Sequence, residues 1–312
     1  MSSDDSASER VLATVSGAVR RGLLAFYGID PTEVLNAGTR PWRDRSEVEA
    51  RGADPAEAAG RPTMAAVLRE SVNSLMGSAT HGRQGSVDYS HLRESQAYAD
   101  HQECAARLAA FEPDELSSRA ERTAFWINLY NALVIDAVIA YGIEKSVREV
   151  SGFFWRAAYR IGGERYSAND LEHGILRANR GHPAIPGPHF GPDDPRRAHV
   201  IEPVDPRVHF ALNCASRSCP PISVYDAAHL EQQLDLAARS FVNNGGVQVD
   251  PESRRVSLSR IFLWYRRDFG GARRALELII PFLDDGPEKT FLSHSRNGLK
   301  VNYQSYDWTL NG

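Results

Sequence analysis

The chain has 312 residues, of which 42% are hydrophobic and 24% are charged. These values are typical of globular proteins and allow one large hydrophobic core or two smaller ones. The net charge of −4 argues against a general nucleic-acid-binding protein, because such proteins present a basic surface to the phosphate backbone.

The N-terminal region divides into a helix and an irregular segment. Apolar side chains recur at helical spacing over residues 11–27, and we expect an amphipathic helix within residues 1–35. Residues 36–62 are rich in Arg, Asp, Glu, Ala, Gly and Pro without periodicity, which predicts a flexible linker or surface loop. A helix over 63–78 then opens the main α+β domain, residues 63–312. The N-terminal helices are accessory to this domain and offer a surface for a protein partner.

We infer the cellular compartment from two features that the sequence does not show, a secretory signal and a membrane span. The first ten residues are polar and acidic and lack the apolar core of a secretory signal. The longest apolar run, residues 124–140, is short for a membrane span and is interrupted by Asn128, Asn131 and Asp136. We therefore expect a cytoplasmic protein that does not bind a membrane. In that reducing compartment, its 3 cysteines are expected to be free, catalytic or metal-bound rather than paired in disulfides.

Helical spacing continues over residues 94–111 and is strongest over 118–141. Apolar side chains lie all round this second segment, which predicts a central, buried helix. Asn128 and Asn131 are three residues apart and share one face of it. Because a buried amide needs hydrogen-bond partners, these two side chains either bind loop backbone or orient a catalytic group.

A β-hairpin and a helix start are predicted next. Residues 159–161 and 164–166 flank two consecutive glycines, the pattern of two short strands joined by a tight turn. Ser167, followed three residues later by Asp170, has the form of an N-terminal capping box. A helix is therefore expected to begin at this point.

The helix after the cap carries a candidate catalytic histidine. By i, i+3 and i+4 spacing, one face of it holds Asn169, Asp170, His173 and Arg177. His173 is flanked by Glu172, and a neighbouring carboxylate would fix the tautomer of its ring. A lone histidine on a helix is more often structural, so both interpretations stay open.

A loop rich in Pro, Gly and His follows at residues 180–207. Its histidines have no ligand-like spacing and are expected at the surface: His182, His189 and His199. The next stretch, VHFALNCASRSCPP (208–221), begins with alternating apolar and polar residues that predict a strand over 208–213. Cys214 and Cys219 follow in a turn that two prolines end. Such a strand end can present a reactive group or merely end the strand.

The remainder of the chain is expected to contain both helices and strands. Its predicted elements are, in order, a helix over 226–243, a hairpin of 246–250 and 255–259, helices over 260–270 and 273–284, and a strand over 301–308. No internal repeat, P-loop or dinucleotide-binding fingerprint is present, and no cofactor is implied.

Four ordered segments resemble the bacterial and plant family known as domain of unknown function 547. They are AFWINLYNA (124–132), IGGERYSANDLEHGILR (161–177), HFALNCASRSCPP (209–221) and YQSYDWTLN (303–311), and the resemblance covers about residues 87–312. The order of central helix, hairpin and histidine segment is also similar to papain-like and transglutaminase-like cysteine enzymes. This similarity implies a central helix packed on a mainly antiparallel sheet. Those enzymes carry their cysteine at the start of the central helix, whereas this chain has none there, so its thiol would follow the histidine in sequence.

The first functional hypothesis is a thiol-dependent hydrolase or acyltransferase acting on an amide, ester or peptide-like substrate. Cys214 or Cys219 would be the nucleophile and His173 its base. Plant members of the family tend to have serine at the position of Cys219, which favours Cys214. Three side chains are candidates for orienting the imidazole: Glu172, Asp170 and Asn131.

The substrate, a small molecule or a peptide, would be bound by polar groups around the thiol. Asn213 or loop N–H groups would stabilise an oxyanion, and Arg217 would lower the pKa of the thiol. The substrate-binding candidates are Asn128, Arg177, Asn213 and Arg217.

Two alternatives stay open. A structural zinc site would draw on His209, Cys214, Cys219 and His173, but their spacing matches no familiar zinc motif, and we expect no metal. A binding or scaffolding module without catalysis would use the cysteines as small hydrophobic side chains. Plant relatives with coiled-coil extensions make the scaffolding role reasonable.

Overall fold

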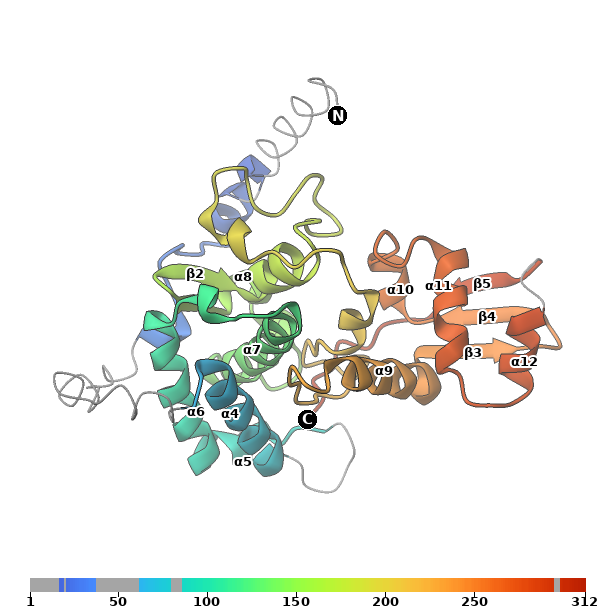
Figure 1. Cartoon of the computed structure of the whole chain (residues 1–312), viewed down its shortest axis with the longest axis horizontal. Coiled ribbons are helices and arrows are strands. Elements are labelled where there is room, and N and C mark those ends of the chain that lie inside the picture. Colours follow the sequence, from blue (N-terminus) through green and yellow to red (C-terminus); the bar gives the residue numbers. More distant parts are fainter. Residues whose placement is uncertain (1–16, 20, 38–61, 80–85, 295–297) are drawn as a thin grey trace.

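The computed structural model describes residues 17–19, 21–37, 62–79, 86–294 and 298–312 (Figure 1). The described part of the predicted N-terminal helix is helical over 17–19 and 21–26, and the rest of that prediction lies outside the described residues. The predicted linker over 36–62 also lies outside them, except for the residues at its two ends.

The chain is an α+β protein in which helices predominate. The α-helices are α4 (Met64–Ala79), α5 (Tyr89–Glu94), α6 (Gln96–Arg107), α7 (Arg119–Ala140), α8 (Phe153–Arg156), α9 (Leu230–Phe241), α10 (Arg260–Trp264), α11 (Ala272–Ile279) and α12 (Pro287–His294). The strands are β1 (Ala158–Ile161), β2 (Glu164–Ser167), β3 (Val247–Asp250), β4 (Arg255–Leu258) and β5 (Lys300–Tyr303). Short 3₁₀ helices are η1 (Leu35–Ala37), η2 (Leu108–Ala110), η3 (Pro113–Glu115), η4 (Val147–Glu149), η6 (Pro195–His199), η7 (Pro206–Phe210) and η9 (Ile280–Phe282), while η5 (Asp170–Leu176) and η8 (Val242–Gly246) are π-helices.

Helix α7 forms the centre of the larger hydrophobic core, as its all-round apolar pattern predicts. Its residues from Thr123 to Ile139 are buried, and Ser118 caps the helix by accepting a hydrogen bond from the backbone N–H of Glu121. Helices α4 and α5 and the π-helix η5 pack against it. Among the described residues, α7 is the one helix long and apolar enough to cross a membrane. Of its most apolar 18-residue stretch, 94% is buried inside the protein.

The predicted α+β class is confirmed, and the sheets are small: Tyr166 of β2 packs against Trp126 of α7, and the Tyr159 hydroxyl of β1 donates to Asp136 of α7. Strands β1 and β2 form an antiparallel pair, and a separate sheet has the order β3-β4-β5, with β4 and β5 parallel. Each of these strands has 4 residues. At about 3.3 Å per residue, such a strand is roughly 13 Å long and cannot cover the whole of a 22-residue helix, so α4, α5 and η5 also pack against α7.

A second, smaller core is built by the C-terminal part of the chain. Figure 1 shows the three-stranded sheet together with α10, α11 and α12 on the side of the molecule away from α4 and α6. Phe210, at the end of η7, belongs to this core, whereas Val208 and Leu212 belong to the core around α7. The segment that leads to Cys214 and Cys219 therefore passes between the two cores.

The first hairpin and the helix cap lie where the sequence predicts them. Ala158 pairs with Ser167 and Ile161 with Glu164, and the turn contains Gly162 at φ +54°. A Cβ at Gly162 would lie 2.9 Å from the Phe111 carbonyl oxygen, so both conformation and space require glycine. The side chain of Asp170 accepts a hydrogen bond from the Ser167 N–H, and the Ser167 hydroxyl accepts one from the Asp170 N–H.

Several C-terminal predictions need correction. The strand predicted over 208–213 is a 3₁₀ helix followed by a turn, and all six residues are buried, so their alternation did not separate an inner from an outer face. The helix predicted from 226 begins at Leu230, the helices predicted over 260–270 and 273–284 are shorter, and the final strand ends at Tyr303. Helix α12 was not predicted. The second hairpin is present, as β3 and β4.

Candidate functional site

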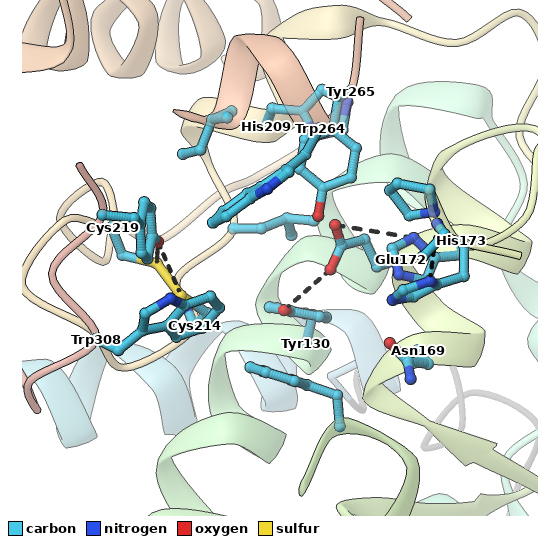
Figure 2. Close-up of a pocket in the computed structure, with 17 residues that line it drawn as sticks. Tyr130, Asn169, Glu172, His173, His209, Cys214, Cys219, Trp264, Tyr265 and Trp308 are labelled. Atoms are coloured by element: carbon cyan, nitrogen blue, oxygen red, sulfur yellow. Dashed lines mark hydrogen bonds and ion pairs between the residues drawn. A yellow bond between two sulfur atoms is a disulfide. The ribbon is translucent and has the colours of Figure 1, made fainter. Parts of the chain in front are cut away.

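A pocket of about 340 Å³ lies between η5, α10 and the loop that carries the cysteines (Figure 2). Cys214 and Cys219 line one part of its wall, and Glu172 and His173 line another. Aromatic side chains supply much of the remainder: Tyr130, Phe154, Trp264, Tyr265, Tyr306 and Trp308. The volume is at the lower end of the range for small-molecule sites.

The π-helix η5 places two consecutive residues, Glu172 and His173, against this pocket. Its wider turn is marked by the Arg177 N–H, which donates to the Glu172 carbonyl five residues earlier. Gly174 allows the helix to approach Phe190, because a Cβ there would lie 2.2 Å from that ring. Helical segments of this kind are frequent at functional sites.

Burial and a hydrogen bond from Arg177 keep the His173 ring neutral. The Arg177 guanidinium donates to Nδ1 of His173 at 2.8 Å, so the proton of the neutral ring is assigned to Nε2. Burial, and then the charge of Arg177, hold the pKa of His173 well below its ordinary value of 6.5. The Glu172 carboxylate is 3.9 Å from Nδ1, too far for a hydrogen bond. Arg177 therefore orients the imidazole, the role predicted for Glu172, Asp170 or Asn131.

Arg177 is part of a buried charge network and does not line the pocket. Its Nε contacts the Asp268 carboxylate, which also lies 2.9 Å from Nε2 of His209. Burial acts to raise the pKa of Asp268, but hydrogen bonds from His209 and Arg177 outweigh burial and hold that pKa below its ordinary value. The His209 ring stacks on Tyr265 with centroids 4.0 Å apart. Arg177, predicted to bind substrate, thus contacts His173 and Asp268 and lies outside the pocket lining.

Glu172 lies between two tyrosines at the inner part of the pocket. The Tyr130 hydroxyl donates to its Oε2 at 3.2 Å, and the Tyr265 hydroxyl points toward the same carboxylate (Figure 2). Burial and the neighbouring Glu172 together raise the pKa values of Tyr130 and Tyr265 well above 10. Among the described residues, no lysine or arginine forms an ion pair with Glu172.

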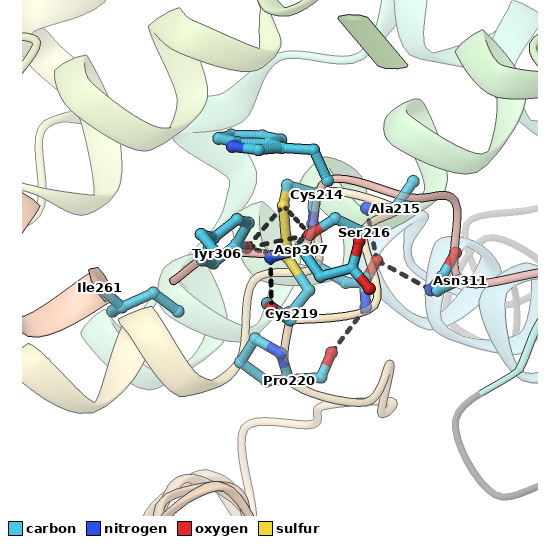
Figure 3. Close-up of a disulfide and its surroundings, with 12 residues drawn as sticks. Cys214, Ala215, Ser216, Cys219, Pro220, Ile261, Tyr306, Asp307 and Asn311 are labelled. Carbon is cyan, nitrogen blue, oxygen red and sulfur yellow. Dashed lines mark hydrogen bonds between the residues drawn. A yellow bond between two sulfur atoms is a disulfide. The ribbon is translucent and has the colours of Figure 1, made fainter. Parts of the chain in front are cut away.

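Cys214 and Cys219 are joined in a disulfide, which for these two residues corrects the prediction of free, catalytic or metal-bound cysteines (Figure 3). Their Cα atoms are 6.2 Å apart, within the ordinary range for such a bond. Ala215 in the intervening loop has φ +61°, a conformation that few non-glycine residues adopt. The Tyr306 hydroxyl lies 3.2 Å from the Cys214 sulfur and 3.1 Å from the Cys219 sulfur. Cys104 is free and buried, and burial raises its pKa to about 11.

The predicted site asparagines lie beside the pocket and bind backbone. Asn131 donates to the Ala211 carbonyl at 3.0 Å and accepts from the Asn213 N–H at 2.9 Å. The side chain of Asn213 in turn donates to the Pro220 carbonyl and accepts from the Ala215 N–H. These contacts hold both ends of the disulfide loop and leave neither amide directed at the pocket.

Asn128 acts in the same way at a different loop. Its amide donates to the Tyr225 carbonyl at 2.7 Å and accepts from the Tyr225 N–H at 2.9 Å. Of the two interpretations of the shared helix face, the geometry fits the one in which both amides bind loop backbone.

Arg217 lies on the far side of the disulfide loop. It is exposed and lines a second pocket, of about 490 Å³, together with several serines and Cys219. The predicted influence of its charge on the thiols would therefore act from outside the aromatic pocket. Asn169 does line the aromatic pocket, which sequence reasoning noted only as a helix-face position.

The loop histidines were predicted to lie at the surface, but the structure buries them wholly or in part. His182 lines the pocket with its ring 4.9 Å from that of His173, and burial, with Arg177, lowers its pKa to about 4. His189 is buried, lies 2.8 Å from the Asp170 carboxylate and stacks on Trp155. His199 is half-buried. Long-range packing creates these environments, and no local spacing signals them.

The described residues contain no group of three or more His, Cys, Asp or Glu side chains arranged to hold a metal ion. Of the four residues considered as zinc ligands, Cys214 and Cys219 are joined in the disulfide, and His209 lies within hydrogen-bond distance of Asp268. These interactions occupy both sulfurs and Nε2 of His209.

Residues 113–242 match the sequence model of a family described as "Protein of unknown function, DUF547". The chain carries a DUF547 domain. The match includes Glu172, His173 and both cysteines, so one wall of the pocket belongs to the DUF547 domain. The aromatic residues Trp264, Tyr265, Tyr306 and Trp308 lie outside the matched range and complete the pocket. No curated protein and no solved structure matches the chain.

Proposed function

We propose that the pocket is the active site of a thiol-dependent hydrolase or acyltransferase, with Cys214 as the nucleophile after reduction of the disulfide. The observation that supports this proposal is that both sulfurs line the same pocket as a buried carboxylate and a neutral imidazole. A related proposal is that the DUF547 domain shares the papain-like or transglutaminase-like arrangement, since a buried central helix precedes a hairpin and a histidine segment.

The chemistry begins with a dithiol or glutathione-type reductant, which converts the disulfide to two thiols and is itself oxidised to a disulfide. A cytoplasmic location, expected from the sequence, would supply such a reductant. The Cys214 thiol then loses its proton to solvent. Hydroxyl groups of Ser216 and Tyr306, each 3.2 Å from the Cys214 sulfur, would donate hydrogen bonds to the thiolate and lower its pKa.

The thiolate attacks the substrate carbonyl, a thioester forms, and the leaving group takes a proton from water. Water or an acceptor amine then cleaves the thioester and restores the thiol. His173 is proposed to donate a hydrogen bond from Nε2 to the substrate carbonyl, because Arg177 occupies its Nδ1 and prevents it from acting as the base through that atom. This assignment replaces the base role suggested by the sequence.

Intact-mass analysis with a small activated ester tests the proposal. Reduced protein should gain one acyl group on Cys214, whereas oxidised protein and Cys214→Ser should gain none. The matched control is Cys104→Ser, which should acylate like wild type, because burial raises the pKa of that thiol to about 11. An adduct distribution equal to that of denatured protein would contradict the proposal.

A binding module without catalysis is the second candidate, favoured by the closed disulfide and by a histidine whose Nδ1 is already bound. In that case, ligands would stabilise the Cys214→Ser variant as strongly as wild type, and no acyl-enzyme would form.

A further inference from the structure

Glu172 is the sole acidic side chain among the described residues that line the aromatic pocket. Its side chain is 11% exposed, and its nearest group capable of positive charge is His173. Burial and Arg177 keep that imidazole neutral, so it does not compensate the carboxylate. A buried carboxylate without a cationic partner is costly to a fold, which makes it a candidate for a ligand-binding group.

Two arginines near the pocket lie outside its lining and share one carboxylate, that of Asp268. The Arg177 guanidinium is bound to Asp268, whose carboxylate is fully buried, and Arg180 contacts the same carboxylate at 3.1 Å. His182 and His209 have pKa values lowered chiefly by burial and are neutral at pH ~7. Among the described residues that line the pocket, Glu172 is therefore the one side chain with a formal charge at pH ~7.

The aromatic wall opposite Glu172 complements this charge. In Figure 2, Trp264 and Trp308 lie toward the disulfide side of the pocket, across from Glu172. Two rings of the pocket already have an arginine of the chain over one face: Trp308 has Arg148 and Tyr265 has Arg177. No arginine or lysine of the described chain lies over Trp264.

The hydroxyl groups around Glu172 leave it able to accept more hydrogen bonds. A carboxylate has about four acceptor positions; the Tyr130 hydroxyl occupies one on Oε2 and the Tyr265 hydroxyl occupies another, so about two remain. The field of Glu172 also reaches Tyr306 beside the sulfurs: burial is the main cause that raises the pKa of Tyr306 to about 12, and Glu172 adds to it. The carboxylate and the sulfurs thus share one electrostatic environment.

We propose that this pocket recognises an organic cation, a primary ammonium or guanidinium group that binds Glu172 and packs against Trp264. The volume of about 340 Å³ suits a ligand of roughly one or two amino-acid residues. The inference rests on the proposed function in one respect: the substrate of the thiol enzyme would be an ester or amide that bears this cation. The binding itself needs no thiol chemistry.

Binding of three matched probes to the full-length oxidised protein tests the inference: phenylbutylammonium, phenylbutanol and phenylbutanoate. Calorimetry and tryptophan fluorescence measure the affinities. The ammonium compound should bind roughly 10- to 100-fold more tightly than the alcohol, and the carboxylate most weakly. Glu172→Gln should abolish the preference for the cation. Glu288→Gln, the same change at an exposed position, should leave it intact.

Equal or tighter binding of the alcohol or the carboxylate to wild-type protein overturns the inference, as does absence of binding by all three probes. If Glu172→Gln fails to fold, the wild-type ranking still decides, and Trp264→Leu should reduce the preference for ammonium about 3- to 10-fold. Because the disulfide stays closed, a cation preference without later acyl-enzyme formation would sink the thiol enzyme and leave this inference standing. Acylation without cation preference would do the reverse.

Discussion

The amide of Asn131 is expected to be a structural clamp for the disulfide loop, and its removal should destabilise the protein. The side chain is fully buried and satisfies both the Ala211 carbonyl and the Asn213 N–H. Asn131→Ala leaves these two groups without partners, at about 1–3 kcal/mol each. The expected loss is about 4 kcal/mol in the free energy of unfolding. At roughly 2–4 °C per kcal/mol for a large domain, the melting temperature should fall by about 8–16 °C.

Thermal and urea unfolding of Asn131→Ala, Asn131→Asp and Asn244→Ala measure this effect. The aspartate keeps an acceptor for the Asn213 N–H but opposes the Ala211 carbonyl oxygen, so it should also be destabilised. Asn244 is exposed and bonds only within its own helical turn, so its alanine variant should lose less than about 1 kcal/mol. If Asn131→Ala melted within about 2 °C of wild type yet lost activity, the amide would have a chemical role and the reasoning would be refuted.

Three further outcomes are expected. Reduction of the Cys214–Cys219 bond, which spans a sequence separation of 5, should cost about 2 kcal/mol in urea unfolding by loop-closure entropy, and a double serine variant should match the reduced protein. Burial lowers the pKa of His182 to about 4 in the folded protein, whereas the unfolded chain keeps the ordinary value of 6.5. Between these two pH values the unfolded state binds a proton that the folded state does not, so the folded state loses stability as the pH falls. Wild type should lose stability over that window more steeply than His182→Asn in thermal melts, and parallel curves would contradict this. Gly174→Ala should lower stability by about 1–3 kcal/mol through overlap with Phe190, whereas an unchanged unfolding midpoint would show that the ring can move.

The elements that could be predicted from the sequence are those with a local cause. Helix α7 is apolar on every side and 22 residues long, so its burial follows from its composition. The hairpin follows from two glycines between short strands, and the start of η5 from the capping pair Ser167 and Asp170.

The elements that could not be predicted depend on contacts distant in sequence. Phe210 packs in one core and Val208 in the other, so the alternation between them does not indicate a half-exposed strand. Closure of the disulfide depends on a turn in which Ala215 has positive φ, a conformation that alanine does not signal.

In the candidate site, too, some features could be predicted from the sequence and others could not. Glu172, His173 and both cysteines were identified from the sequence and line one pocket. The roles assigned to Asn128, Asn131 and Arg177 could not be foreseen, because a buried amide or guanidinium looks the same in sequence whether it faces a ligand or a backbone carbonyl.

The disulfide loop separates two cavities of opposite character. Of these two cavities, Cys214 lines the aromatic pocket, whereas Cys219 lines both that pocket and the serine-rich pocket that contains Arg217. After reduction of the disulfide, we expect a hydrophilic thiol reagent to approach Cys219 from the polar side without entering the aromatic pocket. Selective chemical modification of the two sulfurs thus depends on the polarity of the reagent as well as on thiol acidity, and an adduct on Cys219 alters a wall that both cavities share.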